Sequence, residues 1–337
     1  MPTCLADWRE RALSLEAELG RALIGQPQAL RLAIIAVFAR GHVLLEGDVG
    51  VGKTTLLRAL ARVLGGAYAR IEGTVDLMPA DLVYHTYIDA DGRPAVDRGP
   101  LLRHGDTLAT FFFNEVNRAR PQVHSLLLRV MAERSVSAFD REHAFPHLQV
   151  FADRNRVERE ETFELPVAAR DRFMMEIPVG LPSDPERLRE LMFDTRFHDV
   201  ETLIGTLQPA LLPYRELNAA AGAIQASIAA SADLQHYALE LARATREPQA
   251  FGIEYEGASG HDLLWAGLSP RGMSQWLQAA RVAAWLAGRD HLLPDDLRTV
   301  LRPCLTHRLV LAPVFELRRA EVAPALVETI AARVPAP

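Results

Sequence analysis

The chain has 337 residues, of which 49% are apolar and 24% charged, so it is long enough for two domains and a large buried core. Its net charge of −6 argues against a protein that coats nucleic acid, which would be basic, but it does not exclude a local basic groove. The two cysteines, Cys4 and Cys304, indicate a reducing compartment and not a disulfide scaffold. Charged residues near the start interrupt any leader-like run, and no apolar stretch approaches the roughly 20 residues that span a bilayer. We therefore expect a cytoplasmic protein without a membrane partner.

Short apolar strands alternate with helices in the first half of the chain. Apolar residues at helical spacing predict a helix over residues 5–19, and "HVLLEG" at residues 42–47 predicts a buried strand. A helix over residues 54–66 and buried strands at residues 111–113 and 147–152 are expected to follow. Strands alternating with helices imply a mostly parallel sheet that is covered on both faces.

The character of the sequence changes near Pro182. From about residue 185 onward the chain contains long Ala/Leu/Arg helical patterns and little strand signal. The clearest helix is "GMSQWLQAARVAAWLAGRD" at residues 272–290, and Trp265, Trp276 and Trp285 are predicted core residues of this part. We expect an α/β nucleotide-binding domain over residues 1–182 and a helical domain over residues 183–337.

The segment "GDVGVGKTT" fits the pattern G-x-x-x-x-G-K-[ST] at every fixed position and lies between a predicted strand and a predicted helix. Glycines let the backbone curl so that N–H groups point at phosphate oxygens, and the helix N-terminus adds partial positive charge. Lys53 is expected to reach the β- and γ-phosphates of ATP, and the Thr54 hydroxyl to hold Mg²⁺. A glycine-rich turn that binds nothing is the alternative. The nucleotide-contacting residues expected here are Gly47, Asp48, Val49, Gly50, Val51, Gly52, Lys53, Thr54 and Thr55.

Hydrolysis needs a positioned water and a base at the end of a neighbouring strand, and "FFFNEVNRA" at residues 111–119 supplies such a strand end. This segment resembles the MoxR branch of the AAA+ ATPases, in which a hydrophobic strand precedes Asp-Glu-Ile-Asn-Arg-Ala. The resemblance runs from about residue 23 to about residue 309. It implies the α/β fold of a P-loop NTPase of the AAA+ type, with a parallel-sheet domain followed by a small all-α lid. It also makes Glu115 the catalytic base.

Further segments match the family in the same order, and the resemblance implies a role for residues in each. Ile24 and Gly25 in "LIGQ" would lie beside the adenine, and Asn155 would be the sensor-1 residue. Arg172 in "ELPVAARDRF" would be the finger offered to a neighbouring subunit, and Arg271 in "LSPRG" the sensor-2 arginine of the lid. From the residues alone, Asn155 could cap a loop, Arg172 could form a domain-edge salt bridge, and Arg271 could be a surface arginine.

Asn114 departs from the family pattern at a position that matters for turnover. The family's aspartate there holds Mg²⁺ through a water; an amide can still accept from that water but carries no charge. Losing such an outer-shell partner typically costs about 10–100-fold in metal affinity or activity. We therefore expect ATP and Mg²⁺ to bind and hydrolysis to be slow. The family's Ala-Thr-Gln-Asn-Pro becomes "ADRNR" at residues 152–156, a second departure that points the same way.

The resemblance implies an ATPase that forms a homo-oligomeric ring, expected to be a hexamer, and acts as a chaperone-like remodeller. It also implies a partner with a von Willebrand A-type domain and a role in maturing the metal cofactor of a client enzyme complex. An ATP-gated assembly scaffold with little or no hydrolysis is one alternative. A nucleic-acid-handling loader or initiator is another, but the acidic balance disfavours it.

Overall fold

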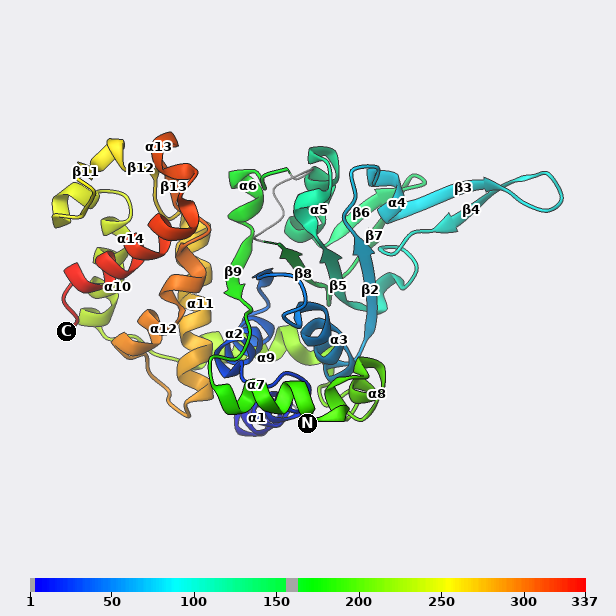
Figure 1. Cartoon of the computed structure of the whole chain (residues 1–337), viewed down its shortest axis with the longest axis horizontal. Coiled ribbons are helices and arrows are strands. Elements are labelled where there is room, and N and C mark those ends of the chain that lie inside the picture. Colours follow the sequence, from blue (N-terminus) through cyan, green and yellow to red (C-terminus); the bar gives the residue numbers. More distant parts are fainter. Residues whose placement is uncertain (1–3, 156–162) are drawn as a thin grey trace.

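Five parallel strands form the central sheet, in the order β2-β5-β8-β1-β9 (Figure 1). The computed structural model describes residues 4–155 and 163–337. The strands are β1 (His42–Glu46), β2 (Ala67–Glu72), β5 (Leu108–Asn114), β8 (Gln149–Arg154) and β9 (Phe173–Pro178). The prediction of a parallel sheet is confirmed, and the strands expected at residues 42–47, 111–113 and 147–152 correspond to β1, β5 and β8.

Helices cover both faces of this sheet. One face carries α1 (Leu5–Ala22), α2 (Pro27–Phe38) and α3 (Lys53–Leu64), and the other carries α5 (Pro121–Glu133). Because side chains alternate along a strand, Phe112 enters the core beneath α1–α3, whereas Phe111 and Phe113 enter the core beneath α5. The three consecutive phenylalanines are therefore buried on the two opposite faces of the sheet.

Two hairpins interrupt the α/β part. After α4 (Pro79–Val83), the hairpin of β3 (Tyr84–Ile88) and β4 (Pro94–Arg98) projects away from the sheet (Figure 1). A second hairpin, β6 (Ser135–Ala138) and β7 (Arg141–Ala144), connects α5 to β8. The short helix α6 (Val167–Arg170) precedes β9.

The segments directly after residue 182 return to the α/β part. These are α7 (Pro185–Phe193), α8 (Val200–Gly205) and α9 (Leu217–Ser227); α8 contacts α3, and α9 contacts α1 and α2. The division at residue 182 stays a prediction. In the part of the chain that the structure describes, no helix has both the length and the apolar character to cross a bilayer.

The lid follows and lies along the β9 edge of the sheet (Figure 1). Its helices are α10 (Ala232–Ala244), α11 (Pro270–Leu286), α12 (Pro294–Leu305), α13 (Pro313–Glu316) and α14 (Arg319–Arg333). It also contains two short antiparallel pairs, β10 (Glu254–Tyr255) with β11 (Ala258–Ser259) and β12 (Leu264–Ala266) with β13 (Val310–Leu311). The lid is thus mainly, and not wholly, helical.

The tryptophans of the lid have different environments. Trp276 is 1% exposed within the lid, and Trp285 packs on Phe38 of α2, with ring centroids 5.0 Å apart. The prediction of a core position is wrong for Trp265, which is 52% exposed. It lies on the short β12–β13 pair, which leaves its ring at the surface, stacked on His261. Trp285 therefore joins the lid to the α/β part.

Candidate nucleotide site

The loop between β1 and α3 is curled as a phosphate cradle requires. Gly50 and Gly52 have φ angles of +80° and +95°, in the left-handed region that glycine enters without steric cost. Gly47 allows a close approach, because a Cβ at this position would lie 2.0 Å from the carbonyl oxygen of Val179. These glycines let the chain turn directly from the end of β1 into α3.

The N-terminus of α3 is open to an anion. Its N-cap is Gly52, which has no side chain, and its first turn, all of which the structure describes, contains no acidic residue. The first N–H groups of a helix lack intrahelical partners and attract negative charge. The buried ammonium of Lys53 donates to the carbonyl oxygens of Gly47 at 2.6 Å and Asp48 at 2.9 Å. Thr54 follows in the same turn, so the free amides, Lys53 and Thr54 all belong to the first turn of α3.

The turn between α1 and α2 lies against this loop. The side-chain amide of Gln26 donates to the carbonyl oxygen of Val51 at 3.2 Å. Gly25 has a φ angle of +70°, and a Cβ there would lie 2.6 Å from the Cβ of Pro182. The structure therefore places Ile24 and Gly25, the residues expected beside adenine, next to the phosphate loop.

The end of β5 presents Asn114 and Glu115. Asn114 is buried, and alternation along the strand places it on the same face as Phe112, the α3 face. Glu115 has a φ angle of +51°, which is uncommon for a residue with a side chain. Its N–H donates to Oδ1 of Asp153 at 2.6 Å, and its carboxylate accepts from Arg118 at 2.9 Å. The candidate base is thus held by a strained turn and an ion pair.

Asp153 is a site residue that the sequence showed only as a departure from the family pattern. It lies in β8, its side chain is 3% exposed, and its Oδ2 is 3.8 Å from the Nζ of Lys53. Burial raises the pKa of this carboxyl to about 6, although the N–H of Glu115 and the charge of Lys53 oppose the rise. A carboxylate inside a strand of otherwise apolar pattern, two residues before Asn155, was the signal that could have identified it.

Gly73 was not identified from the sequence either. Its N–H donates to the carbonyl oxygen of Asn114 at 2.7 Å, and a Cβ there would lie 2.1 Å from the carbonyl oxygen of Glu115. The turn that carries Glu115 therefore depends on a glycine in the segment after β2. A glycine at a strand end is too common a signal to reveal this contact.

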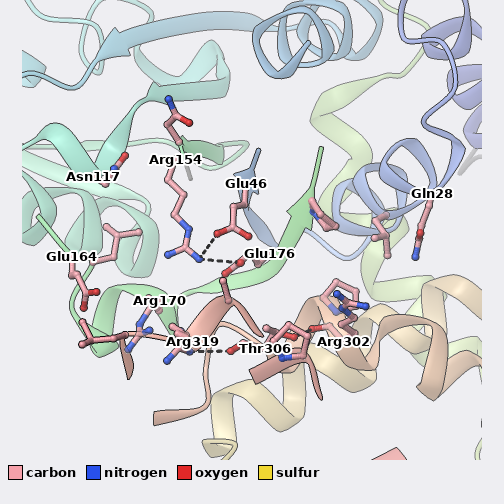
Figure 2. Close-up of a pocket in the computed structure, with 18 of the residues that line it drawn as sticks. Gln28, Glu46, Asn117, Arg154, Glu164, Arg170, Glu176, Arg302, Thr306 and Arg319 are labelled. Carbon is pink, nitrogen blue, oxygen red and sulfur yellow. Dashed lines mark hydrogen bonds and ion pairs between the residues drawn. The ribbon is translucent and has the colours of Figure 1, made fainter. Parts of the chain in front are cut away.

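Asn155 and Arg154 line a cavity of about 760 Å³ between the ends of β1, β8 and β9 and the lid helices α12 and α14 (Figure 2). The guanidinium of Arg154 lies 3.0 Å from a carboxylate oxygen of Glu46 and 3.0 Å from one of Glu176 (Figure 2). Burial raises the pKa of Glu176, against the lowering effect of Arg154. Arg154 thus joins three strands, which explains an arginine at this position. Arg156, the last residue of the segment "ADRNR" that departs from the family pattern, lies outside the described residues.

Arg172 and Arg271 are brought together at the start of β9. Arg271 is in the first turn of α11, and its guanidinium donates to Oδ2 of Asp171 at 2.9 Å. The N-cap residue of that helix, Ser269, donates to the other oxygen of Asp171 at 2.6 Å. Arg172 is partly exposed and donates to the carbonyl oxygen of Ala168 at 2.8 Å. The ion pair at this domain edge is therefore formed by Asp171 with Arg271.

Both arginines lie at the end of β9 that is remote from the phosphate loop. In the parallel β1–β9 ladder, Phe173 pairs with His42 and Pro178 pairs with Glu46. The loop follows Glu46, whereas Arg172 precedes Phe173. At roughly 3.3 Å per residue, about 17 Å of strand separates the two ends. The structure thus gathers the loop, Asn114, Glu115 and Asp153 on one side and the two arginines on another.

The residues around the loop fit a nucleoside triphosphate with Mg²⁺. The curled amides, the open helix end and the buried Lys53 suit phosphate oxygens. In the ranges 4–155 and 163–337, no three His, Cys, Asp or Glu side chains converge as metal ligands. A hard cation would therefore be held largely through the phosphates, with Thr54 and Asn114 as the predicted protein contacts.

Comparisons with known proteins agree with this geometry. Residues 42–175 match the ATPase family associated with various cellular activities (AAA), and residues 260–330 match the AAA lid domain. The chain is 56% identical to the protein MoxR of Methylorubrum extorquens, over 99% of this chain and 97% of that protein. It is 34% identical to the chaperone MoxR1 of Mycobacterium tuberculosis, over 92% of this chain and 78% of that protein. A solved structure from Cytophaga hutchinsonii, proposed to be an ATPase, has a TM-score of 0.81 and 28% identity, over 98% of this chain and 96% of that one. The chain therefore belongs to the MoxR-type AAA+ ATPases.

Proposed function

We propose that the chain is a subunit of a homo-oligomeric ring, a hexamer, in which each ATP lies between two copies. The observation that carries this proposal is the separation of Arg172 and Arg271 from the phosphate loop of their own subunit. Arginines contribute to phosphoryl transfer by stabilising charge on the phosphates, and a finger of this kind is worth about 10³–10⁵ in rate. A triphosphate on Lys53 would therefore receive both arginines from a neighbouring copy.

Within one subunit, Glu115 is the proposed general base and Asn155 the side chain that senses the γ-phosphate. Glu115 is ion-paired with Arg118 in the structure, so it must leave this partner before it can orient a water. Mg²⁺, when bound with ATP, neutralises charge on the phosphates. We propose that turnover is slow because Asn114 has no charge with which to hold the metal's water shell.

The proposed role is chaperone-like remodelling of a client enzyme complex, including the maturation of its metal cofactor. The relative named chaperone MoxR1 supports the first part. The family resemblance supports the second part, together with a partner that carries a von Willebrand A-type domain and a cytoplasmic location. ATP-dependent movement of the lid against β9 would transmit the nucleotide state to such a partner, since α11 and α12 both contact that strand.

ATP hydrolysis by wild type, Glu115→Gln and Lys53→Ala tests the site, with the assembly state measured in parallel. We expect Lys53→Ala to lose ATP binding and Glu115→Gln to retain binding but lose turnover. Activity that is indifferent to both changes would remove the proposed site. If the wild type and the Asn114→Asp variant both bind ATP but neither hydrolyses it, the result would favour the assembly scaffold.

A mixing experiment tests whether the site is shared between copies. Lys53→Ala and Arg172→Ala subunits should each be inactive alone. Mixed rings should partly recover, because some interfaces combine an intact loop with an intact arginine. Arg189→Ala, a change of an exposed arginine on α7, serves as the matched control and should behave as wild type. No recovery, with mixed rings demonstrated, would place the arginine within one subunit.

A further inference from the structure

Three polar side chains lie at or next to the ends of three adjacent strands, on the α3 face of the sheet. Glu72 of β2 pairs with Asn114 of β5, and Asp153 of β8 is in register with Leu45 of β1. Since β5 and β8 pair at the residues just before them, Asn114 and Asp153 are neighbours across the sheet. Adjacent strands lie about 4.8 Å apart. The strand that leads into the phosphate loop is β1. Counted from it across the sheet, Asp153 lies on the first neighbouring strand, Asn114 on the second and Glu72 on the third.

The Asp153 carboxylate is held in one orientation on the α3 face of the sheet. Its Oδ1 accepts the N–H of Glu115 at 2.6 Å, which fixes its orientation, and its Oδ2 is directed to Lys53 at 3.8 Å. Burying a carboxylate is unfavourable unless a charge partner or a ligand compensates for lost water. Because a P-loop lysine contacts the β- and γ-phosphates of a bound nucleotide, a carboxylate this close to Lys53 would lie beside the phosphates that carry the metal.

The other carboxylates at this end of the sheet are placed differently, and two of them, Glu46 and Glu176, pair with Arg154. Glu72 has a side chain that is 56% exposed and pairs with Arg70 at 3.2 Å. Glu115 is paired with Arg118 and is the proposed base. Asn114 carries no charge. Asp153 thus combines burial, fixed orientation and contact with the phosphate-binding lysine.

We infer that Asp153 is the carboxylate this chain directs toward Mg²⁺ in the ATP site, in place of the acid that Asn114 lacks. The negative charge has moved by one strand, from β5 to β8, and remains on the α3 face. Mg²⁺ bound to nucleotides usually needs only one or two protein carboxylates in addition to phosphates and waters. This inference rests on the proposed ATP-dependent function and would account for Mg²⁺ binding by a site that has an amide at position 114.

Nucleotide binding with and without Mg²⁺ tests the assignment in the full-length protein. The dissociation constant of a fluorescent ATP analogue is measured in excess Mg²⁺ and in EDTA, for wild type and Asp153→Asn. The variant keeps an oxygen for the N–H of Glu115, so it removes charge and little else. We expect Mg²⁺ to strengthen binding about 10–100-fold less in the variant than in wild type. Binding in EDTA should be unchanged or tighter, because a negative charge near the phosphates is gone.

Two further variants sharpen the comparison. The double variant Asn114→Asp with Asp153→Asn moves the charge back to β5 and should regain the Mg²⁺ effect. Glu72→Gln neutralises the rival carboxylate on the same face and should retain the wild-type Mg²⁺ effect. Thermal melting of each variant identifies any that fails to fold, and the double variant provides a positive signal that lost folding could not produce.

Distinct outcomes would overturn the inference. A loss of affinity in Asp153→Asn that is equal with and without Mg²⁺ would mean that Asp153 acts only on Lys53. An Mg²⁺ effect that is intact in Asp153→Asn, or absent in Glu72→Gln, would assign the metal to another side chain. Wild type that binds no ATP under either condition would instead refute the proposed function itself.

Discussion

Replacing Asp153 with asparagine should stabilise the nucleotide-free protein, and more at alkaline than at acid pH. Burial raises the pKa of this carboxyl from 3.8 to about 6, so the folded state disfavours its ionised form. The stability that the protonated Asp153 carboxyl contributes is fully present below pH 3.8 and is lost as the pH rises through about 6. At 1.36 kcal/mol for each pH unit, the full loss is about 3 kcal/mol. An asparagine does not ionise and avoids this loss.

Urea unfolding followed by tryptophan fluorescence at pH 8 and pH 5 measures the effect. Linkage predicts a gain in the free energy of unfolding of about 3 kcal/mol at pH 8 and roughly half of that at pH 5. Lys53, Glu115 and Arg70 are the charged groups that also act on this carboxyl, and all remain in the variant. The exposed Glu72, changed to Gln, is the control and should show little difference between the two pH values. A variant that is less stable than wild type, or equally improved at both pH values, would refute the argument from burial.

Other substitutions probe the sheet around the site. Burial lowers the pKa of His42 to about 3, so the contribution of His42 to stability should fall by about 2 kcal/mol between pH 7.5 and pH 5 as the unfolded chain takes up the proton. His42→Gln should change the pH dependence of urea unfolding by that amount relative to wild type, and a pH dependence equal to that of wild type would contradict the assignment. Arg154→Met leaves Glu176 buried without its counter-charge and should cost about 3–5 kcal/mol in thermal melting, with partial recovery on adding Glu176→Gln. Gly73→Ala forces a Cβ to within 2.1 Å of the Glu115 carbonyl oxygen, so ATP hydrolysis should fall more than ATP binding when both are measured.

Much of the nucleotide site was predictable from the sequence because its determinants are local. A glycine and lysine spacing between a strand and a helix specifies a curled loop, and the structure has that loop with Gly50 and Gly52 at positive φ. Apolar runs with no polar alternation predicted strands buried on both faces, as Phe111–Phe113 are. Motif order then predicted the sheet domain and the lid that follows it.

Only the tertiary structure decided which side chains meet across strands and between the two parts of the chain. Asp153 lies beside Lys53 because β8 pairs with β1 in one register, and a shift by one residue would turn its carboxylate to the opposite face. Arg271 contacts Asp171, which lies 100 residues earlier in the chain, because the lid packs along β9. A short motif encodes backbone shape within a few residues, whereas register and lid position result from the packing of many distant side chains, which no single segment specifies.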